Sequence, residues 1–168
     1  MKEHRISLFS REELLEQLKK ARRGALCVTV SSEEPSLLRE MYPDRDTEQM
    51  LMSLEALSEE CRRKARPWIA EIPLLMETIA WLPETARALV KLGVSEIRLV
   101  APSAEDLPTD HSDATAHASK ELLRTKALAC LKATDGNETV VTSSWPPLAE
   151  HLPPPPPKQT WLQRMLHR

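Results

Sequence analysis

Glycine is scarce in this chain, which has only three glycines among 168 residues. Gly24, Gly93 and Gly136 each follow a helix-like segment and precede a β-branched run. With these positions, neither a G-x-G-x-x-G dinucleotide motif nor a Walker phosphate loop can be written, which argues against the common types of mononucleotide and dinucleotide enzyme. We expect the three glycines instead to end helices in the left-handed conformation.

Cysteines are also few, and long apolar runs are missing. Cys27, Cys61 and Cys130 are odd in number, far apart and each inside an apolar segment. This spacing suggests neither a disulfide framework nor a metal knuckle, and the thiols are expected to be buried and free in a reducing compartment. No stretch has secretory or transmembrane length, so we expect a cytoplasmic protein.

The chain has no strong excess of either charge. Its 23 basic and 25 acidic residues give a formal net charge of −2, which provides no global attraction toward nucleic acid or an anionic membrane. The content of 41% hydrophobic and 29% charged residues is that of an ordinary globular protein. The length suits one domain, which we place at residues 1–148.

The runs after the three glycines are typical of strands. Residues 25–30, 96–101 and 138–143 are short, rich in β-branched side chains and bounded by turn residues. Helical segments separate them, so the strands are expected to pair in parallel, with residues 5–9 as a short edge strand. The predicted fold is α/β: a small, mainly parallel sheet of three to four strands with flanking helices.

Between the first two of these strands we expect a helical insertion at about 33–92. Ser10 and Glu13 form a capping box before the first helix, with Phe9 and Leu14 placed for a hydrophobic staple, while Asp46 and Gln49 begin a helix that reaches about residue 64. The segment 67–82 is apolar almost all round, which predicts a central buried helix. A further helix opens at Pro83, and a last one spans about 112–133. The predicted core includes Trp68, Ile72, Leu75, Ile79 and Leu99.

Proline dominates the C-terminal part of the sequence. Residues 149–157 are predicted to be a proline-rich linker, and residues 158–168 a short amphipathic tail motif. A Trp-containing helix held away from a domain is typical of a ligand for a groove on a partner protein, although the tail can also fold back on its own domain. The candidate partner-binding residues are Trp161, Leu162, Arg164, Met165, Leu166 and Arg168.

Serines follow the predicted strands. In parallel sheets ligands bind beyond the carboxyl ends of the strands, where these serines are expected to gather. Each serine can instead simply cap the helix or turn that follows it. The residues of this possible ligand edge are Ser31, Ser32, Ser103, Ser143 and Ser144.

His111, Asp113 and His117 have a spacing that can in principle offer ligands to one metal, or a base to one of the serines. The segment matches no defined metal motif and lacks a third ligand-bearing segment, and solvent-facing histidines on a capped, acidic helix start explain it better. We therefore predict no metal and no cofactor.

Two basic clusters remain, at residues 19–23 and 62–66. They can contact phosphate groups, but both fall at predicted helix C-termini, where cations complement the helix dipole.

Three hypotheses follow. The first is a non-enzymatic interaction protein, such as an adaptor, a chaperone-like protein or a regulatory subunit, that binds a protein partner through its tail and its apolar helical surface. The second is a small-molecule or metal-dependent enzyme that uses the serine edge together with His111, Asp113 and His117. The third, a nucleic-acid accessory protein that uses the basic clusters, ranks below both.

Overall fold

The computed structural model describes residues 2–8, 10–21, 23–32, 34–76, 78–102, 120–148 and 150–155. They form an α/β fold around a five-stranded sheet in which every pair of neighbouring strands is parallel. The strands are β1 (Glu3–Ile6), β2 (Ala25–Thr29), β3 (Trp68–Pro73), β4 (Glu96–Val100) and β5 (Val140–Ser143). Their order in the sheet is their order in the chain.

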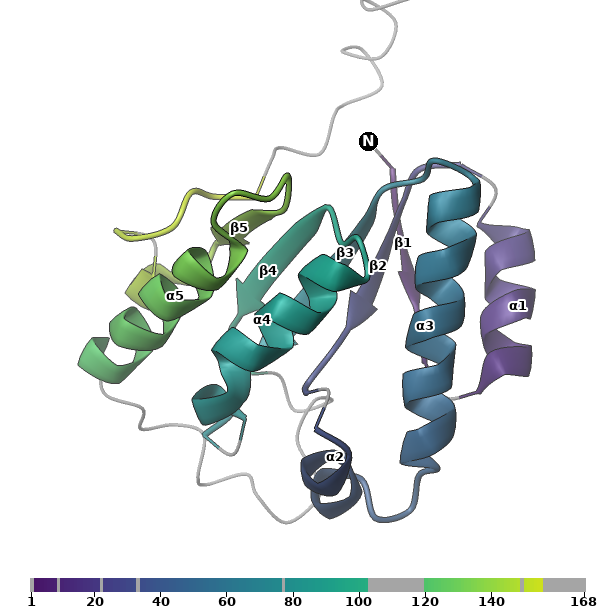
Figure 1. The fold of residues 1–168 in the computed structure, drawn as a ribbon, viewed down its shortest axis with the longest axis horizontal. Coiled ribbons are helices and arrows are strands. Elements are labelled where there is room, and N and C mark those ends of the chain that lie inside the picture. The colour runs from purple at the N-terminus through teal and green to yellow at the C-terminus, as the bar shows by residue number, and fades with distance from the viewer. Residues whose placement is uncertain are drawn as a thin grey trace, which may run out of the picture.

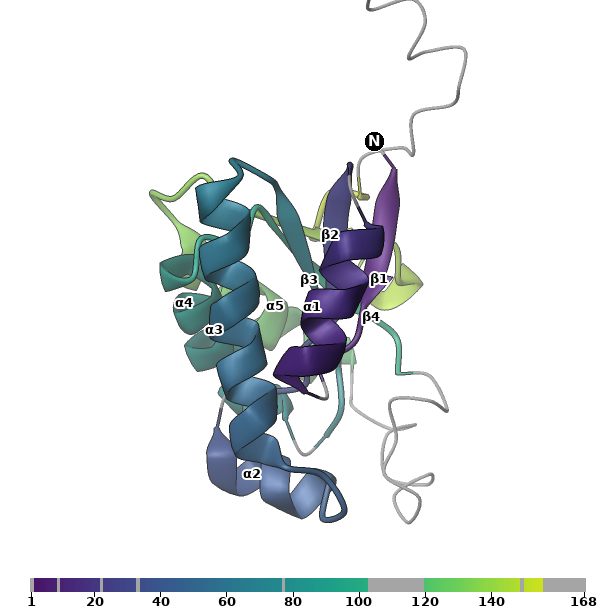
Figure 2. The same ribbon diagram turned by 90° about the vertical axis from the view of Figure 1, so that its right-hand side faces the viewer.

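Helices connect the strands. The α-helices are α1 (Arg11–Lys20), α2 (Pro35–Met41), α3 (Thr47–Arg63), α4 (Leu82–Lys91) and α5 (Lys120–Thr134), and two short 3-10 turns are η1 (Ile79–Trp81) and η3 (Pro146–Leu148). Figure 1 shows α1, α3, α4 and α5 along one face of the sheet, with α2 at the end toward which the strands point. Figure 2 shows the same layering from the side. The helices α1, α3, α4 and α5 thus cover one face of the sheet, and the other face is free of described helices.

The predicted helix ends are confirmed. Ser10 Oγ accepts a hydrogen bond from the Glu13 amide at 3.2 Å, and Asp46 Oδ1 accepts one from the Gln49 amide at 3.0 Å. Phe9, the other half of the expected staple, lies outside the described residues. The three glycines have φ angles of +101°, +76° and +77°, so the expectation of left-handed backbone at these positions is correct. Gly24 does not end its helix, however, because α1 ends at Lys20 with Ala21 as its C-cap.

The prediction of one buried helix over 67–82 is wrong. Trp68–Pro73 is the central strand β3, and helix resumes only at η1 and α4, so the helical insertion at 33–92 is interrupted and the sheet has five strands. All six residues of β3 are buried. A strand covered on both faces has a continuous apolar sequence, which periodicity alone does not distinguish from a buried helix.

The predicted core residues are buried nonetheless. Trp68, Ile72, Leu75, Ile79 and Leu99 all have exposures of 4% or less. Leu148 and Leu152 belong to the same core, and the Ser143 amide donates to the Pro153 carbonyl at 3.0 Å. Packing on the core therefore continues past residue 148, into the segment predicted as a linker. No helix in the described residues is long and apolar enough to span a membrane.

Candidate functional site

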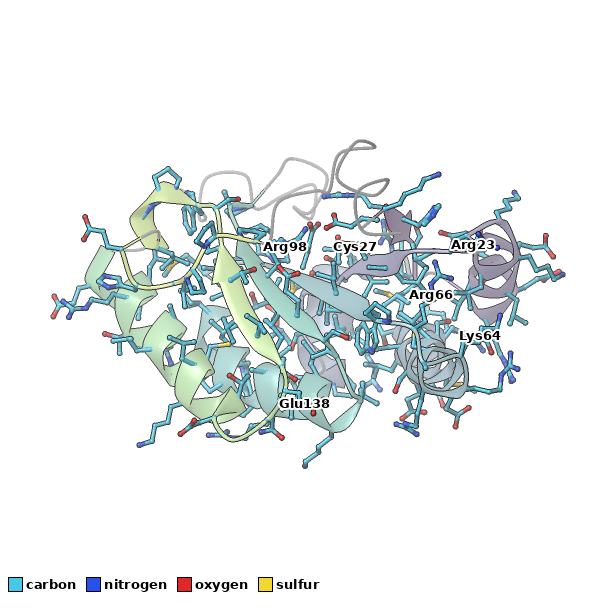
Figure 3. All side chains as sticks on the ribbon, turned by 90° about the horizontal axis from the view of Figure 1, so that it is seen from above. Arg23, Cys27, Lys64, Arg66, Arg98 and Glu138 are labelled. Atoms are coloured by element: carbon cyan, nitrogen blue, oxygen red, sulfur yellow. The ribbon has the colours of Figure 1, made fainter. Side chains whose placement is uncertain are left out.

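The face of the sheet away from the helices carries two rows of side chains that the strand register brings together. Arg5, Cys27, Ile69 and Glu96 are successive partners across β1 to β4. Two residues further along the strands, Thr29, Glu71, Arg98 and Thr142 are partners across β2 to β5. Figure 3 shows Cys27 and Arg98 on this side of the sheet, opposite the helices.

Arg98 lies at the centre of a buried ion cluster. Its guanidinium binds Glu96 at 3.0 Å, Glu71 at 3.2 Å and Glu3 at 3.2 Å. Thr142 Oγ1 donates to Glu96 at 2.6 Å. Burial acts to lower the pKa of Arg98, but its hydrogen bonds to Glu96 and Glu3 raise the pKa overall, so the side chain stays charged.

The contact between Glu3 and Arg98 also reports the shape of the sheet. Glu3 is in β1 and Arg98 in β4, so two strands lie between them. Neighbouring strands are about 4.8 Å apart, which separates β1 from β4 by roughly 14 Å in a flat sheet. Arginine and glutamate side chains do not easily bridge that distance to within 3.2 Å, so the sheet is concave on the side of the ion cluster.

A pocket of about 420 Å³ opens at the carboxyl ends of β1, β2 and β3. Its floor continues the ion cluster through Arg5, Cys27, Thr29 and Glu71. Arg5 binds Glu71 at 2.7 Å, and its side chain is 77% exposed.

Two further walls enclose the pocket. The polar wall consists of Ser31, Ser32, Tyr42 and Arg45. The Ser31 and Tyr42 hydroxyl oxygens are 2.7 Å apart and hydrogen-bonded, and the Arg45 guanidinium lies 5.0 Å from the Tyr42 ring centre. The apolar part of the lining comes mainly from α2 and α3 through Leu38, Met50, Leu51 and Leu54.

The structure brings only part of the predicted serine edge together. Ser31 and Ser32 line the pocket. Ser32 Oγ accepts from the Glu34 amide at 3.1 Å, although the cap of α2 is Glu34 itself. Ser143 is buried and donates to the Leu99 carbonyl at 2.7 Å, which is a structural role, while Ser144 is exposed and does not line the pocket.

Several predicted site residues lie outside the described residues. These are Ser103, His111, Asp113 and His117, together with all six tail residues, Trp161, Leu162, Arg164, Met165, Leu166 and Arg168. Within the described ranges, no group of three or more His, Cys, Asp or Glu residues is placed to hold a metal ion.

The Cys27 thiol at the pocket floor is not poised as a nucleophile. Burial, and then the nearby Glu71 carboxylate, raise its pKa to about 12. Cysteine reacts as the thiolate, so Cys27 stays in its unreactive protonated form at neutral pH. Its burial as a free thiol, like that of Cys61 and Cys130, confirms the expectation for the three cysteines.

The residues that define this site were missed in the sequence: Arg5, Tyr42, Arg45, Glu71 and Arg98. One signal was present. Glu71 and Arg98 each interrupt an apolar run, and an isolated charge inside a predicted buried segment indicates either a buried ion pair or a site.

Comparison with known proteins gives a fold but no family. No family model matches the chain, and no curated protein matches it. Among solved structures, the crystal structure of the HMG-CoA lyase from Bacillus subtilis is similar, with a TM-score of 0.54 and 16% sequence identity. The likeness covers 83% of this chain and 43% of the lyase chain, so the chain spans less than half of that protein. At this identity the likeness confirms the α/β fold.

Proposed function

We propose that this protein binds a small molecule with one anionic group and an apolar portion, in the pocket at the carboxyl ends of β1, β2 and β3. The observation that carries the proposal is the composition of the lining, which combines Arg5 and Arg45 with apolar side chains of α2 and α3. Small-molecule sites in parallel sheets occur at this edge, and most combine apolar walls with a few polar groups.

Arg5 is suited to receive the anionic group. Its bond to Glu71 uses Nη2, and within the described part of the chain no bond is made by its other guanidinium nitrogens. Arginine presents five donors in a planar fork that matches carboxylate and phosphate oxygens. A bound anion therefore gains charge-assisted hydrogen bonds without removing Glu71 from the buried cluster, because Arg98 holds the other carboxylate oxygen.

Binding fits the described groups better than catalysis does. The described lining contains no histidine, its carboxylate Glu71 is paired with two arginines, and the Cys27 thiol is protonated. General acid–base chemistry needs a group that exchanges protons near neutral pH. The enzyme hypothesis therefore needs a base from beyond these residues, whereas ligand binding needs none.

The proposal is tested by calorimetric titration with two probes of similar size, hexanoate and hexanamide. We expect hexanoate to bind more tightly, because only it carries the charge that Arg5 and Arg45 recognise. Arg5→Met is expected to remove most of this preference. Arg87→Met is the matched control, since Arg87 is also exposed and paired with one glutamate, Glu84, on α4. Equal binding of both probes contradicts the proposal.

A second function, binding of a protein partner through the tail and the apolar helical surface, is favoured by one feature of that surface. Trp81, at the start of α4, is 44% exposed, and so is Leu128 on α5. Lys126 of α5 donates to the Ala80 carbonyl, which brings these two segments together. Large apolar side chains left exposed on neighbouring elements are typical of interaction surfaces.

The tail hypothesis is tested by ending the chain after residue 155, which keeps the bond between Ser143 and Pro153. We expect the thermal midpoint to stay unchanged and partner capture to be lost. Trp161→Ala in the full chain should reproduce the loss of capture, because buried aromatic anchors dominate interface energies. A lowered midpoint with intact capture indicates instead that the tail packs on the domain.

A further inference from the structure

The two basic segments, residues 19–23 and 62–66, meet at the amino edge of the sheet through Arg66 and Ala21, which are 45 residues apart in the chain. Arg66 Nε donates to the Gly24 carbonyl at 2.5 Å, and Arg66 Nη1 donates to the Ala21 carbonyl. Arg66 therefore joins the end of α3 to the end of α1. Figure 3 shows Arg23, Lys64 and Arg66 grouped at this end of the molecule.

The start of the chain adds to the same surface. The Ala25 amide donates to the Lys2 carbonyl at 2.9 Å, and His4 Nε2 lies 2.8 Å from the Arg23 carbonyl as its hydrogen-bond donor. We call the resulting surface the amino-edge basic patch. Its members are Lys2, Lys20, Arg23, Arg62, Arg63, Lys64 and Arg66, and all except Arg66 are exposed.

The patch is only partly neutralised. Glu60 binds both Arg63, at 2.8 Å, and Lys64, at 2.6 Å. Lys2, Lys20, Arg23 and Arg62 make no ion pair with any described residue. Although the chain has a net charge of −2, it gathers cations at this one edge. A charged partner responds to the local electrostatic potential of such a patch, so the negative net charge does not prevent an anion from binding here.

A hollow of about 320 Å³ adjoins these cations, and Arg62 and Arg66 line it together with Ser58 and Ser95. Arg66 Nη2 is buried and has no hydrogen-bond partner within the described part of the chain. A buried guanidinium N–H without an acceptor is costly. The exposed Arg62 guanidinium at the same hollow can receive an anionic oxygen directly.

We propose that the amino-edge basic patch binds the phosphate backbone of a nucleic acid, at a site separate from the pocket at the carboxyl edge. Four of its seven cations are arginines, whose fork matches phosphate oxygens. None of its members is aromatic, so the contact is to the backbone and independent of base sequence. The patch itself contains no large exposed apolar side chain, which disfavours insertion into a membrane; such side chains are at Leu15, Met52, Met76, Trp81, Leu128 and Val140.

The test uses fluorescence anisotropy of the full chain with a labelled single-stranded oligonucleotide and a labelled duplex of random sequence, over a range of salt concentrations. The patch variant is Arg23→Glu with Arg62→Glu. The matched control is Lys91→Glu with Arg124→Glu, which makes the same change in net charge at exposed positions on α4 and α5. Circular dichroism of both variants checks that they remain folded.

We expect the unaltered protein and the control variant to bind with strongly salt-dependent affinity. The patch variant should bind about tenfold or more weakly, and the slope of log K against log salt should shrink by about 0.9 for each duplex phosphate that the variant no longer neutralises. Equal weakening in both variants, or no binding by the unaltered protein, overturns the proposal. So does tighter binding to vesicles of phosphatidylcholine and phosphatidylserine than to either oligonucleotide, because that result assigns the patch to a membrane surface.

Discussion

Arg5 and Arg98 each bind one oxygen of the Glu71 carboxylate, and Arg5 is exposed whereas Arg98 is buried. Arg5 Nη2 lies 2.7 Å from Glu71 Oε2 with its side chain 77% exposed, and Arg98 Nη1 lies 3.2 Å from Oε1 with its side chain 9% exposed. The pair joins the solvent-facing pocket to the buried ion cluster. It also offers a matched comparison of a surface ion pair with a buried one.

We expect Arg98→Met to destabilise the fold by about 3–5 kcal/mol, because it leaves the carboxylates of Glu3, Glu71 and Glu96 together without their shared cation. Arg5→Met should cost less than about 1 kcal/mol, as solvent screens an exposed pair. Urea denaturation at neutral pH measures both free energies of unfolding. Similar values for the two variants contradict the central role of Arg98.

The glycines offer a second matched comparison. A Cβ on Gly24 comes within 2.2 Å of the Lys2 carbonyl oxygen, whereas a Cβ on Gly136 meets nothing within 4 Å, and both residues have positive φ. We expect Gly136→Ala to cost about 1–2 kcal/mol from backbone strain alone. Gly24→Ala should cost at least about twice as much, because β1 must also shift. Equal thermal midpoints for the two variants would show that β1 is not held against Gly24.

A third expectation concerns alkaline pH. Burial, followed by the Glu71 charge, raises the pKa of Cys27 from about 9 to about 12 in the folded state. Between these values the unfolded chain has released the thiol proton and the folded chain has kept it, so the free energy of unfolding falls as pH rises. Below pH 9 both states hold the proton and this contribution is constant.

The measurement compares the unaltered protein with Cys27→Ala by chemical denaturation under reducing conditions from pH 8 to pH 11. The unaltered protein should lose stability more steeply above pH 9, by up to about 1.4 kcal/mol per pH unit. Cys61 and Cys130 are present in both chains and cancel from the difference. Parallel curves would indicate that the Cys27 thiol titrates normally in the folded protein.

Local signals in the sequence were sufficient for much of the fold. The helix ends before Gly93 and Gly136, the caps at Ser10 and Asp46, and the strands that follow the glycines all depend on short-range geometry. The central strand β3 was mistaken for a helix because it is buried on both faces and has no alternating pattern. Its buried side chains were nevertheless predicted, since burial follows from hydrophobicity in either conformation.

The candidate site depends on contacts that no local pattern contains. Glu3 and Arg98 are 95 residues apart and Arg5 and Glu71 are 66 apart, so the ion cluster exists only after the sheet has formed and curved. The expectation that serines after the strands lie at the carboxyl edge of the sheet holds for the positions of Ser31 and Ser32, because it follows from parallel topology. The amino-edge basic patch likewise requires Arg66 to reach the end of α1.

Binding of an anionic ligand in the carboxyl-edge pocket is tested most directly by titrating the isotopically labelled full chain with hexanoate and following the amide resonances by heteronuclear NMR. We expect saturable shifts concentrated at Thr29, Ser31, Ser32 and Arg45, around the pocket. These shifts should be absent with hexanamide and strongly reduced in Arg5→Met. Shifts that appear away from the carboxyl edge, or that hexanamide reproduces, would contradict the assignment of this pocket to an anionic ligand.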